Sequence, residues 1–340
     1  MNKVTISDVA AKAGVSKTTV SRILNGIYDH TKEETRNRVL QVIKDFDYRP
    51  NALAKGLKSS RTNVIGIVLS NLKNPFWSTV LEGVEDVCRD SGFNLMICNS
   101  DEEPEMEEQY IREFQTRRVD GIVINPTVRN PILYQKLLEQ NYPLVAINRR
   151  IPDICIHNIV VDNRKGASLA VHHLIHNGRK KIAVFVYKNL NVSTWQERVE
   201  GYCSAMLESG FTEEDLIIQE TDQLSGSTKE TTLKFLRDHP DVDAIFSTNN
   251  MMTLEVIEAI KELKLQIPKD IAIVGYDETI WSKHLDPPLT TIKQPSYEMG
   301  KIAAQLLIKT IVAKRKPKPG TIVLEPQLII RNSCGSQIGK

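Results

Sequence analysis

Short polar stretches follow seven predicted strands in the larger part of the chain. They are NPFW (74–77), NSD (99–101), NPT (125–127), NRR (148–150), VDN (161–163), STNN (247–250) and YDE (276–278). In parallel α/β sheets, ligands bind beyond the carboxyl ends of the strands. The stretches supply amides, carboxylates, guanidinium groups and aromatic rings, which suit hydrogen bonding to a small polar molecule and packing against it. They therefore predict a ligand-binding cleft.

Sequence patterns of common enzymes and metal sites are absent. The chain contains no GxxxxGK[ST], HExxH or GxSxG motif. His172 and His176 lie one helical turn apart, but a zinc site needs at least three protein ligands, so we expect a solvated helix end and no metal. The acidic run at 101–105 is expected to be a solvated helix start. We expect neither a cofactor nor an enzymatic activity.

The charge distribution separates the first 61 residues from the rest. Residues 1–61 contain 12 Lys and Arg against 6 Asp and Glu, whereas the remainder contains 32 against 36. A basic segment on a mildly acidic body is typical of a nucleic-acid-binding module joined to another domain. The five cysteines are scattered, without a Cys-x-x-Cys pair, so we expect reduced thiols.

The sequence shows no sign of membrane insertion or export. No apolar run reaches the roughly 18 residues that a membrane helix needs. The first residues, MNKVTISD, lack the apolar core of a signal peptide. We expect a cytoplasmic protein that has no membrane partner and is associated with the nucleoid.

Three short amphipathic helices are predicted in the basic segment. The apolar face of the first consists of Ile6, Val9, Ala10 and Ala13. Ser7 is its expected cap, and Gly14 supplies the turn that follows. Ser16 is the expected cap of a second helix at 17–24, and a third helix is predicted at 33–46.

A linker follows the third helix. Asn51 is placed to cap a short helix that ends at Leu57, and Gly56 lies inside it. A helix of this length is unstable by itself in water. We therefore expect residues 51–57 to become ordered only with a partner.

From residue 63, apolar runs of strand length alternate with helical segments. Helices are predicted at 78–90, 107–117, 132–140, 165–176, 197–209, 229–238, 253–262 and 297–312, and one final strand at 321–331. Near-continuous apolar strands separated by helices indicate parallel sheets that are covered on both faces. The number of such units exceeds one comfortable sheet, so we expect two α/β subdomains.

The order of the motifs resembles that of LacI/GalR-type transcription regulators. The opening VTISDVAAKAGVSKTTVSRILNG (4–26), with EETRNRVLQVI (33–43) and YRPNALAKGL (48–57), is similar to the DNA-binding head and hinge of that family. The signposts in the core are NPFW, DGIVINP (120–126), INRR (147–150), VVDN (160–163), RVEGY (198–202), STNN, VGYDE (274–278) and PPLTTIKQP (287–295). The resemblance implies an α + α/β fold. A three-helix helix-turn-helix head and a hinge helix precede a two-subdomain, parallel-sheet core of the type I periplasmic-binding-protein kind.

The resemblance also divides the chain. It implies a head at 1–47, a hinge at 48–61 and a core at 62–340 that binds the effector and dimerises. The subdomains of the core are expected at about 62–160 with 293–324, and at about 161–292 with 325–340. A homodimer is expected, because each hinge helix needs a partner and paired heads read a pseudo-palindromic operator in double-stranded DNA.

By this resemblance, the second helix reads the DNA. Its expected base-contacting residues in the major groove are Lys17, Thr18, Thr19 and Arg22. The expected phosphate contacts are Thr5, Ser7, Ser16, Ser21, Asn25 and His30. The hinge contributes Asn51, Ala54 and Leu57, with Leu57 as a wedge in the minor groove. The sequence departs from the family at YDHTK (28–32), where we expect Thr31 to cap the third helix.

The resemblance further implies an effector site in the cleft. Phe76 or Trp77 would supply an aromatic face. The expected polar contacts are Asn125, Asn148, Arg149, Arg198, Asn249 and Asp277, with Thr194, Trp195 and Gln294 as further candidates. Family members often have Asp at the position of Asn148, so Arg149 and Arg198 face one carboxylate fewer, and Asp277 is expected to pair with one of them.

The missing carboxylate favours an anionic effector. Arginine binds carboxylates and phosphates bidentately, so we expect a sugar acid, such as a keto-deoxy sugar acid, with a neutral sugar as the alternative. A structural salt bridge is the alternative role for Arg149. The expected function is a DNA-binding repressor of a carbohydrate-utilisation operon. The alternatives are a regulator that uses a protein corepressor and a sugar-modifying enzyme with a DNA-binding head, for which Asp162 or Asp277 would supply the base or nucleophile.

Overall fold

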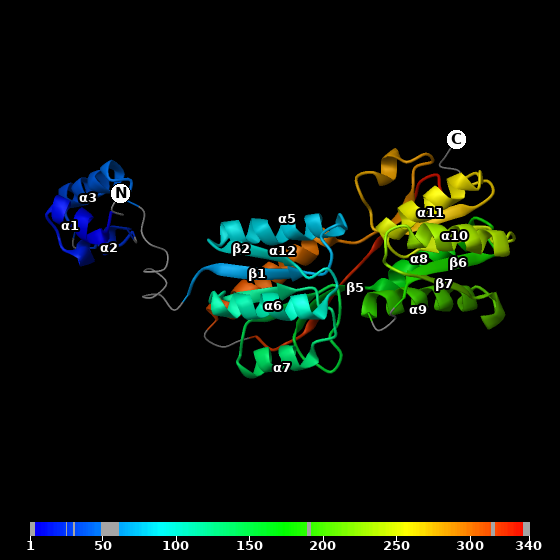
Figure 1. The fold of residues 1–340 in the computed structure, drawn as a ribbon, viewed down its shortest axis with the longest axis horizontal. Coiled ribbons are helices and arrows are strands. Elements are labelled where there is room, and N and C mark those ends of the chain that lie inside the picture. Colours follow the sequence, from blue (N-terminus) through cyan, green and yellow to red (C-terminus); the bar gives the residue numbers. More distant parts are fainter. Residues whose placement is uncertain are drawn as a thin grey trace. The chain divides into compact units, whose positions relative to one another are not determined.

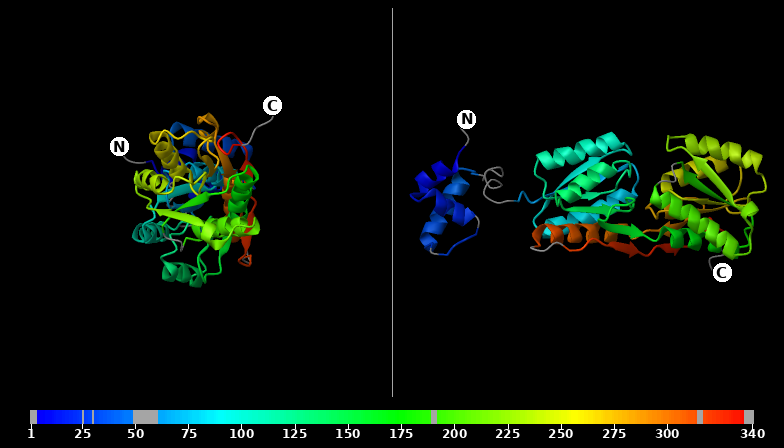
Figure 2. Two further views of the ribbon diagram at one scale, coloured as in Figure 1. Left: turned by 90° about the vertical axis from the view of Figure 1, so that its right-hand side faces the viewer. Right: turned by 90° about the horizontal axis from the view of Figure 1, so that it is seen from below.

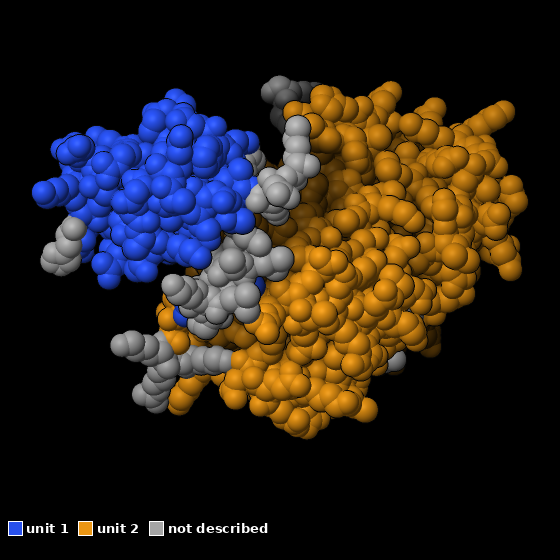
Figure 3. Space-filling model, turned by 60° about the vertical axis from the view of Figure 1, so that its left-hand side comes forward, with its two compact units in different colours: residues 1–62 blue, residues 63–340 orange. Residues whose placement is uncertain are grey.

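The computed structural model describes residues 4–24, 26–29, 31–48, 61–188, 192–313 and 317–335. The chain forms two compact units, residues 1–62 and residues 63–340 (Figures 1 and 3). The predicted hinge residues Asn51, Ala54 and Leu57 lie outside the described residues, as do Asn25 and His30.

The first unit contains a three-helix cluster. Its helices are α1 (Ile6–Ala13), α2 (Lys17–Leu24) and α3 (Glu33–Asp45). Val9, Val20 and Val39, one from each helix, are fully buried at the centre. The Arg38 side chain adds a polar tie, because its Nε donates to the Ala13 carbonyl at 3.0 Å. The apolar periodicity of the sequence therefore predicted the core of this unit.

The helix caps of the first unit differ partly from those expected. α1 is capped by Thr5, whose backbone N–H and hydroxyl both donate to the Asp8 carboxylate at 2.7 Å. Ser7 is therefore not the cap, because Thr5 and Asp8 have the three-residue spacing of a capping box. Ser16 caps α2 as predicted, since its hydroxyl accepts from the Thr19 N–H at 3.1 Å.

The prediction that Thr31 caps α3 was wrong. The capping position is Lys32, which makes no side-chain bond to the helix. Glu33 and Glu34 in the first turn stabilise this end instead, because negative charge is favourable at a helix N-terminus. At the end of α1, Gly14 has the expected left-handed backbone (φ 66°), which lets the chain turn sharply into α2.

The second unit contains two six-stranded sheets. One has the order β11-β5-β4-β3-β1-β2 and the other β12-β10-β9-β8-β6-β7. The strands of the first are β1 (Val64–Leu69), β2 (Asn94–Asn99), β3 (Gly121–Ile124), β4 (Leu144–Ile147), β5 (His157–Val161) and β11 (Thr321–Leu324). Those of the second are β6 (Ile182–Tyr187), β7 (Ile217–Thr221), β8 (Ala244–Ser247), β9 (Ala272–Tyr276), β10 (Thr290–Lys293) and β12 (Gln327–Ile329). All described strand pairs are parallel except β10 with β12.

Helices cover both faces of each sheet. On the first sheet, α5 (Phe76–Asp90) and α12 (Ser296–Val312) pack on one face, and α6 (Pro104–Thr116) and α7 (Pro131–Glu139) on the other. On the second sheet, α10 (Ser227–Asp238) and α11 (Asn250–Glu262) lie opposite α8 (Asn163–His176) and α9 (Ser193–Glu208). Short 3₁₀ turns occur at Glu213–Asp215 and Ser282–His284. We call the layers around the two sheets the N-subdomain and the C-subdomain.

The chain passes between the two subdomains three times. The passages follow β5, β10 and β11, and they lie beside one another because β5 pairs with β11 and β10 with β12 (Figure 2). The prediction of one final strand was therefore wrong, because β11 and β12 belong to different sheets. Pro326 separates them and cannot donate to a strand ladder.

Several helices begin earlier than their apolar periodicity predicts. α5 begins at Phe76 rather than at residue 78, and α9 begins at Ser193 rather than at residue 197. α6 begins at Pro104, a residue that is favourable at the first helical position. Some of the polar residues that follow the strands therefore lie in the first turns of helices. The helical hydrogen bonds fix the backbone there, and so fix where these side chains begin.

Two glycines allow α5 and α12 to pack closely. A Cβ atom on Gly300 would lie 2.0 Å from the Val80 carbonyl oxygen, and one on Gly83 would lie 2.1 Å from the Tyr297 carbonyl oxygen. Each helix therefore contacts the backbone of the other. The pair covers one face of the N-subdomain sheet.

We expect Gly300→Ala to destabilise the protein by about 1–3 kcal/mol, because overpacking against a backbone atom outweighs the higher helix propensity of alanine. Urea unfolding followed by circular dichroism measures the change. Gly320→Ala is the matched control, because nothing lies within 4 Å of its added Cβ and its φ is not positive. Equal stability of the two variants would show that the helices can separate without cost.

Candidate functional site

The exposed side of α2 is basic and rich in hydroxyls. Lys17, Thr18 and Arg22 are exposed on this helix, whereas Val20 and Ile23 face the core. Thr19 is half-buried, and its hydroxyl lies 2.9 Å from that of Ser16. An exposed helix with such side chains fits the major groove of B-DNA.

The other predicted phosphate-contacting residues have different surroundings. The Thr5 hydroxyl is engaged in the α1 cap, whereas Ser7 is half-buried in the first turn of α1. Ser21 is half-buried on α2 and has an interaction of its own. The exposed residues of α2 are therefore the side chains of the first unit that are best placed to contact DNA.

The strand ends of the second unit carry backbone strain. Left-handed φ values occur at Asp101 (51°), Glu102 (64°), Val128 (61°), Asn148 (65°) and Asp277 (75°). Such values are uncommon for residues other than glycine, and for a β-branched residue such as Val128 they are outliers. Strained residues cluster at ligand-binding sites, where the surrounding structure holds them. The polar stretches predicted to line a cleft include three of these five positions, and the other two directly follow such a stretch.

Asp277 lies at the centre of a polar cluster between the subdomains. It is buried, and its Oδ1 accepts from Gln294 Nε2 at 2.5 Å. Burial raises the pKa of Asp277, against the lowering effects of the Arg198 charge and of hydrogen bonds from Gln294, Asn74 and the Asn250 backbone. Asn74 is a residue of the N-subdomain, and its Oδ1 accepts from Asn250 Nδ2 of the C-subdomain at 2.8 Å. The cluster therefore joins the two halves of the cleft.

Arg198 is held rigidly beside this cluster. Its Nε donates to Asn163 Oδ1 at 3.0 Å, and its NH1 donates to the Thr248 carbonyl at 2.7 Å. The guanidinium carbon lies 3.6 Å from the centre of the Tyr276 ring, a close cation–π contact. The charge of Arg198 also favours the ionised form of Asp277, but the described residues include no ion pair between the two, so the expected pairing stays a prediction.

Arg149 forms a salt bridge with Glu102, which is the alternative to an effector contact that the sequence left open. Its NH1 and NH2 donate to the two carboxylate oxygens of Glu102 at 2.7 and 2.6 Å. The same NH1 donates to the Pro126 carbonyl at 3.2 Å, and Trp195 lies within cation–π distance at 5.5 Å. The prediction that residues 101–105 are only a solvated helix start was wrong for Glu102, because this side chain turns inward to Arg149.

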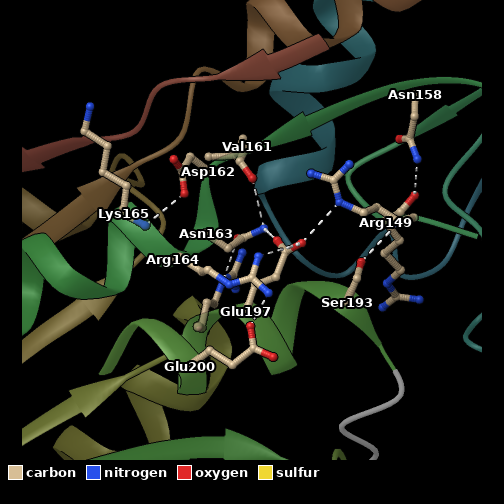
Figure 4. Close-up of polar contacts among 12 residues, drawn as sticks. Arg149, Asn158, Val161, Asp162, Asn163, Arg164, Lys165, Ser193, Glu197 and Glu200 are labelled. Carbon is tan, nitrogen blue, oxygen red and sulfur yellow. Dashed lines mark hydrogen bonds and ion pairs between the residues drawn. The ribbon is translucent and has the colours of Figure 1, made fainter. Parts of the chain in front are cut away.

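Glu197 is a functional candidate that the sequence analysis missed. Its carboxylate accepts from Arg150 Nε of the N-subdomain at 3.2 Å and from Asn163 Nδ2 at 2.9 Å (Figure 4). Arg164 lies 3.8 Å from it and also pairs with Glu200. A second link is the Arg150 backbone N–H, which donates to the Ser193 hydroxyl at 3.0 Å. No local pattern distinguishes Glu197 from a solvated helix residue.

Glu107 is a second acidic residue whose role was missed. Its carboxylate accepts from the Thr127 N–H at 2.7 Å, from Asn130 Nδ2 at 3.0 Å and from the Tyr134 hydroxyl. Burial raises its pKa, while these hydrogen bonds oppose the rise. Glu107 therefore fixes the loop that follows β3.

A cavity of about 150 Å³ lies between the subdomains. Its lining consists of Glu102, Thr127, Arg129, Lys188, Val192, Trp195, Asp222 and Gln223. Trp195 supplies its aromatic side chain, whereas Phe76 and Trp77 are both buried in the N-subdomain core with ring centres 4.9 Å apart. The earlier start of α5 places both rings in helical turns that face the sheet.

The remaining predicted effector residues occupy fixed positions around the cleft. Thr194 is buried in the first turn of α9. Asn249 caps α11, and its Oδ1 accepts from the Met251 N–H at 2.9 Å. Asn125 is buried, and its Nδ2 donates to the Ile147 carbonyl at 3.2 Å.

Several buried polar atoms near the cleft lack a partner. Among the described residues they are Asn125 Oδ1, Asn148 Oδ1, Asn250 Oδ1, Gln294 Oε1 and Arg149 Nε. Buried polar atoms in native proteins almost always have hydrogen bonds, so these atoms are available to bond to a ligand or to water. They come from both subdomains, as a binding site between them requires.

The structure offers no sign of a metal site or a membrane span in its described part. No group of three His, Cys, Asp or Glu side chains there could hold a metal ion, and no described helix is long and apolar enough to cross a bilayer. The five cysteines are free thiols.

Comparison with known proteins identifies both units. Residues 5–51 match the family model of bacterial regulatory proteins of the lacI family. Residues 62–328 match the model of periplasmic binding proteins and the sugar binding domain of the LacI family. The HTH-type transcriptional regulator KdgR of Bacillus subtilis (strain 168) is 34% identical over 334 residues, which are 97% of each chain.

Two solved structures support the same assignment over the full length. The complex of the transcriptional regulator CelR with cellobiose has a TM-score of 0.72 and 30% identity, and covers 97% of this chain and 99% of that one. The Lac repressor dimer bound to operator and the anti-inducer ONPF has a TM-score of 0.87 and 26% identity, over 98% of this chain and 99% of that one. These relatives are named transcriptional regulators or repressors, and their structures confirm the predicted fold. The chain belongs to the LacI family of helix-turn-helix transcriptional regulators.

Proposed function

We propose that this regulator represses a carbohydrate-utilisation operon and releases its operator when a sugar or sugar acid binds between the subdomains. The observation that carries the proposal is the polar cluster around Asp277, with Arg198 beside it. Asn74 of the N-subdomain bonds to Asn250 of the C-subdomain within this cluster. A ligand that bonds to the unpartnered atoms on both sides would change the relative position of the subdomains, because its contacts differ between the two arrangements.

The DNA side of the proposal rests on α2. Lys17, Thr18 and Arg22 are exposed on one short helix, and Arg22 is long enough to bind a guanine bidentately. Two copies of the head would read a pseudo-palindromic operator, so we propose a homodimer. The Lac repressor dimer bound to its operator is a structural relative with this arrangement. The proposed hinge contacts, including Leu57 in the minor groove, remain part of this hypothesis.

The effector side rests on rigid polar groups. Arg198 and Asp277 would bond to ligand hydroxyls or to an anionic group, and Gln294, Asn125 and Asn148 would supply amide oxygens. CelR binds cellobiose, which supports a carbohydrate ligand for this chain. Because Glu102 neutralises Arg149, that arginine supports an anionic ligand less than the sequence suggested.

We expect Arg22→Ala to weaken binding to the specific operator by about 1–3 kcal/mol, the range for one bidentate base contact. The probe is a duplex selected from random sequence by the wild-type protein, and binding is measured by fluorescence anisotropy at several salt concentrations. Lys44→Ala is the control, because it removes one exposed positive charge from α3 rather than from α2. Equal losses in the two variants would contradict base reading by α2.

We expect Arg198→Lys to abolish ligand-induced stabilisation, because lysine cannot donate to Asn163 and Thr248 while it stacks on Tyr276. Thermal unfolding with D-glucose, D-ribose, cellobiose and D-gluconate measures the effect, since a bound ligand raises the midpoint. Arg179→Lys is the control, because Arg179 bonds to the Asp243 and Pro268 carbonyls away from the cleft. Undiminished stabilisation of Arg198→Lys would place the ligand elsewhere.

A further inference from the structure

Among the described residues that line the cavity between the subdomains, one positive charge has no counterpart. Glu102 pairs with Arg149 at 2.6 Å, and Lys188 pairs with Asp222 at 3.0 Å. Arg129 also lines this cavity, and within the described residues it has neither a hydrogen-bond nor an ion-pair partner. The described lining is therefore left with one uncompensated guanidinium group.

The loop that carries Arg129 is fixed on both sides. On one side, Thr127 donates to Glu107 through its N–H at 2.7 Å and its hydroxyl at 3.1 Å. On the other, Asn130 Nδ2 donates to Glu107 at 3.0 Å and to the Pro104 carbonyl at 2.8 Å. Arg149 NH1 adds a bond to the Pro126 carbonyl at 3.2 Å. A buried carboxylate and a paired guanidinium thus hold the residues around Arg129.

The residue before Arg129 is strained. Val128 has a φ of 61°, a strained value for a β-branched residue that persists only where the surroundings enforce it. The strain and the Glu107 anchor together set the point from which the Arg129 side chain leaves the backbone.

We infer that Arg129 binds an anionic oxygen group of the effector, a carboxylate or a phosphate, and so selects a charged sugar derivative over a neutral sugar. The guanidinium fork bonds to two oxygens of either group. Thr127 and Gln223 line the same cavity and can bond to hydroxyl groups of the effector. Trp195 can pack against its apolar face. This inference rests on the proposed effector role of the cleft and names its specificity residue.

Isothermal titration of the full-length protein tests the inference. The probes are D-gluconate, D-glucuronate and D-galacturonate, each beside D-glucose and D-galactose, with glucose 6-phosphate as the phosphate arm. We expect at least one charged probe to bind wild type about tenfold or more tightly than the neutral sugars, and Arg129→Gln to remove this preference. Preference for an acid or for the phosphate identifies which oxygen group is bound.

Arg112→Gln is the matched control. Arg112 is an exposed arginine of the same subdomain, but it pairs with Glu108 at 2.9 Å and does not line this cavity. We expect this variant to keep the wild-type preference. Val128→Gly supplies a second test, because glycine relieves the strain and frees the loop, so the preference should fall while the fold persists.

Other results would overturn the inference. They are binding of neutral sugars alone, no binding of any charged probe, or an equal preference in wild type and Arg129→Gln. Neutral-sugar binding that still depends on Arg198 would leave the proposed function intact. Failure of the proposed function would show separately, as specific DNA binding that Arg22→Ala does not weaken.

Discussion

The carboxylate of Glu197 links the parts of the cleft. It contacts Arg150 from the N-subdomain and Asn163 at the start of α8, and Asn163 in turn accepts from Arg198. One buried acid therefore connects a loop of one subdomain to the arginine that lies beside Asp277 in the other. A buried charge without partners is strongly unfavourable, so these contacts are mutually dependent. A ligand that moves Arg198 or Arg150 would disturb the same carboxylate.

The cleft shows how a rigid scaffold supports polar loops. The inner strands of both sheets are buried on both faces, so the polar residues that can meet a ligand lie mainly beyond their carboxyl ends. At several of these ends the backbone takes left-handed conformations at residues other than glycine, and neighbouring side chains hold them. Glu107 and Glu102 serve in this way, through Thr127 and Arg149. The acids thus position the cationic and amide groups that a ligand would meet.

The sequence predicted the elements better than the partners of their side chains. Continuous apolar runs such as VIGIVL alternate with helical segments, and the helices of the head have apolar residues at helical spacing, so the sheets and the head could be derived from these patterns. The pairing of Arg149 with Glu102 could not, because 47 residues separate the two in sequence and no periodicity relates them. Glu107 and Glu197 look like solvated helix residues for the same reason. The cap at Thr5 was missed because Ser7 is a capping residue type as well, and the predicted cap of α3 was wrong because Lys32 occupies the capping position without a side-chain bond.

The three passages between the subdomains have a consequence for how this protein is made. The N-subdomain sheet receives its edge strand β11 only at residues 321–324, and α12, which covers one face, only at residues 296–312. During synthesis, the apolar surface beneath α12 stays uncovered until nearly the whole chain has left the ribosome. A chain that terminates before α12 would therefore leave the N-subdomain sheet, most of which is made early, without the helix that covers one of its faces.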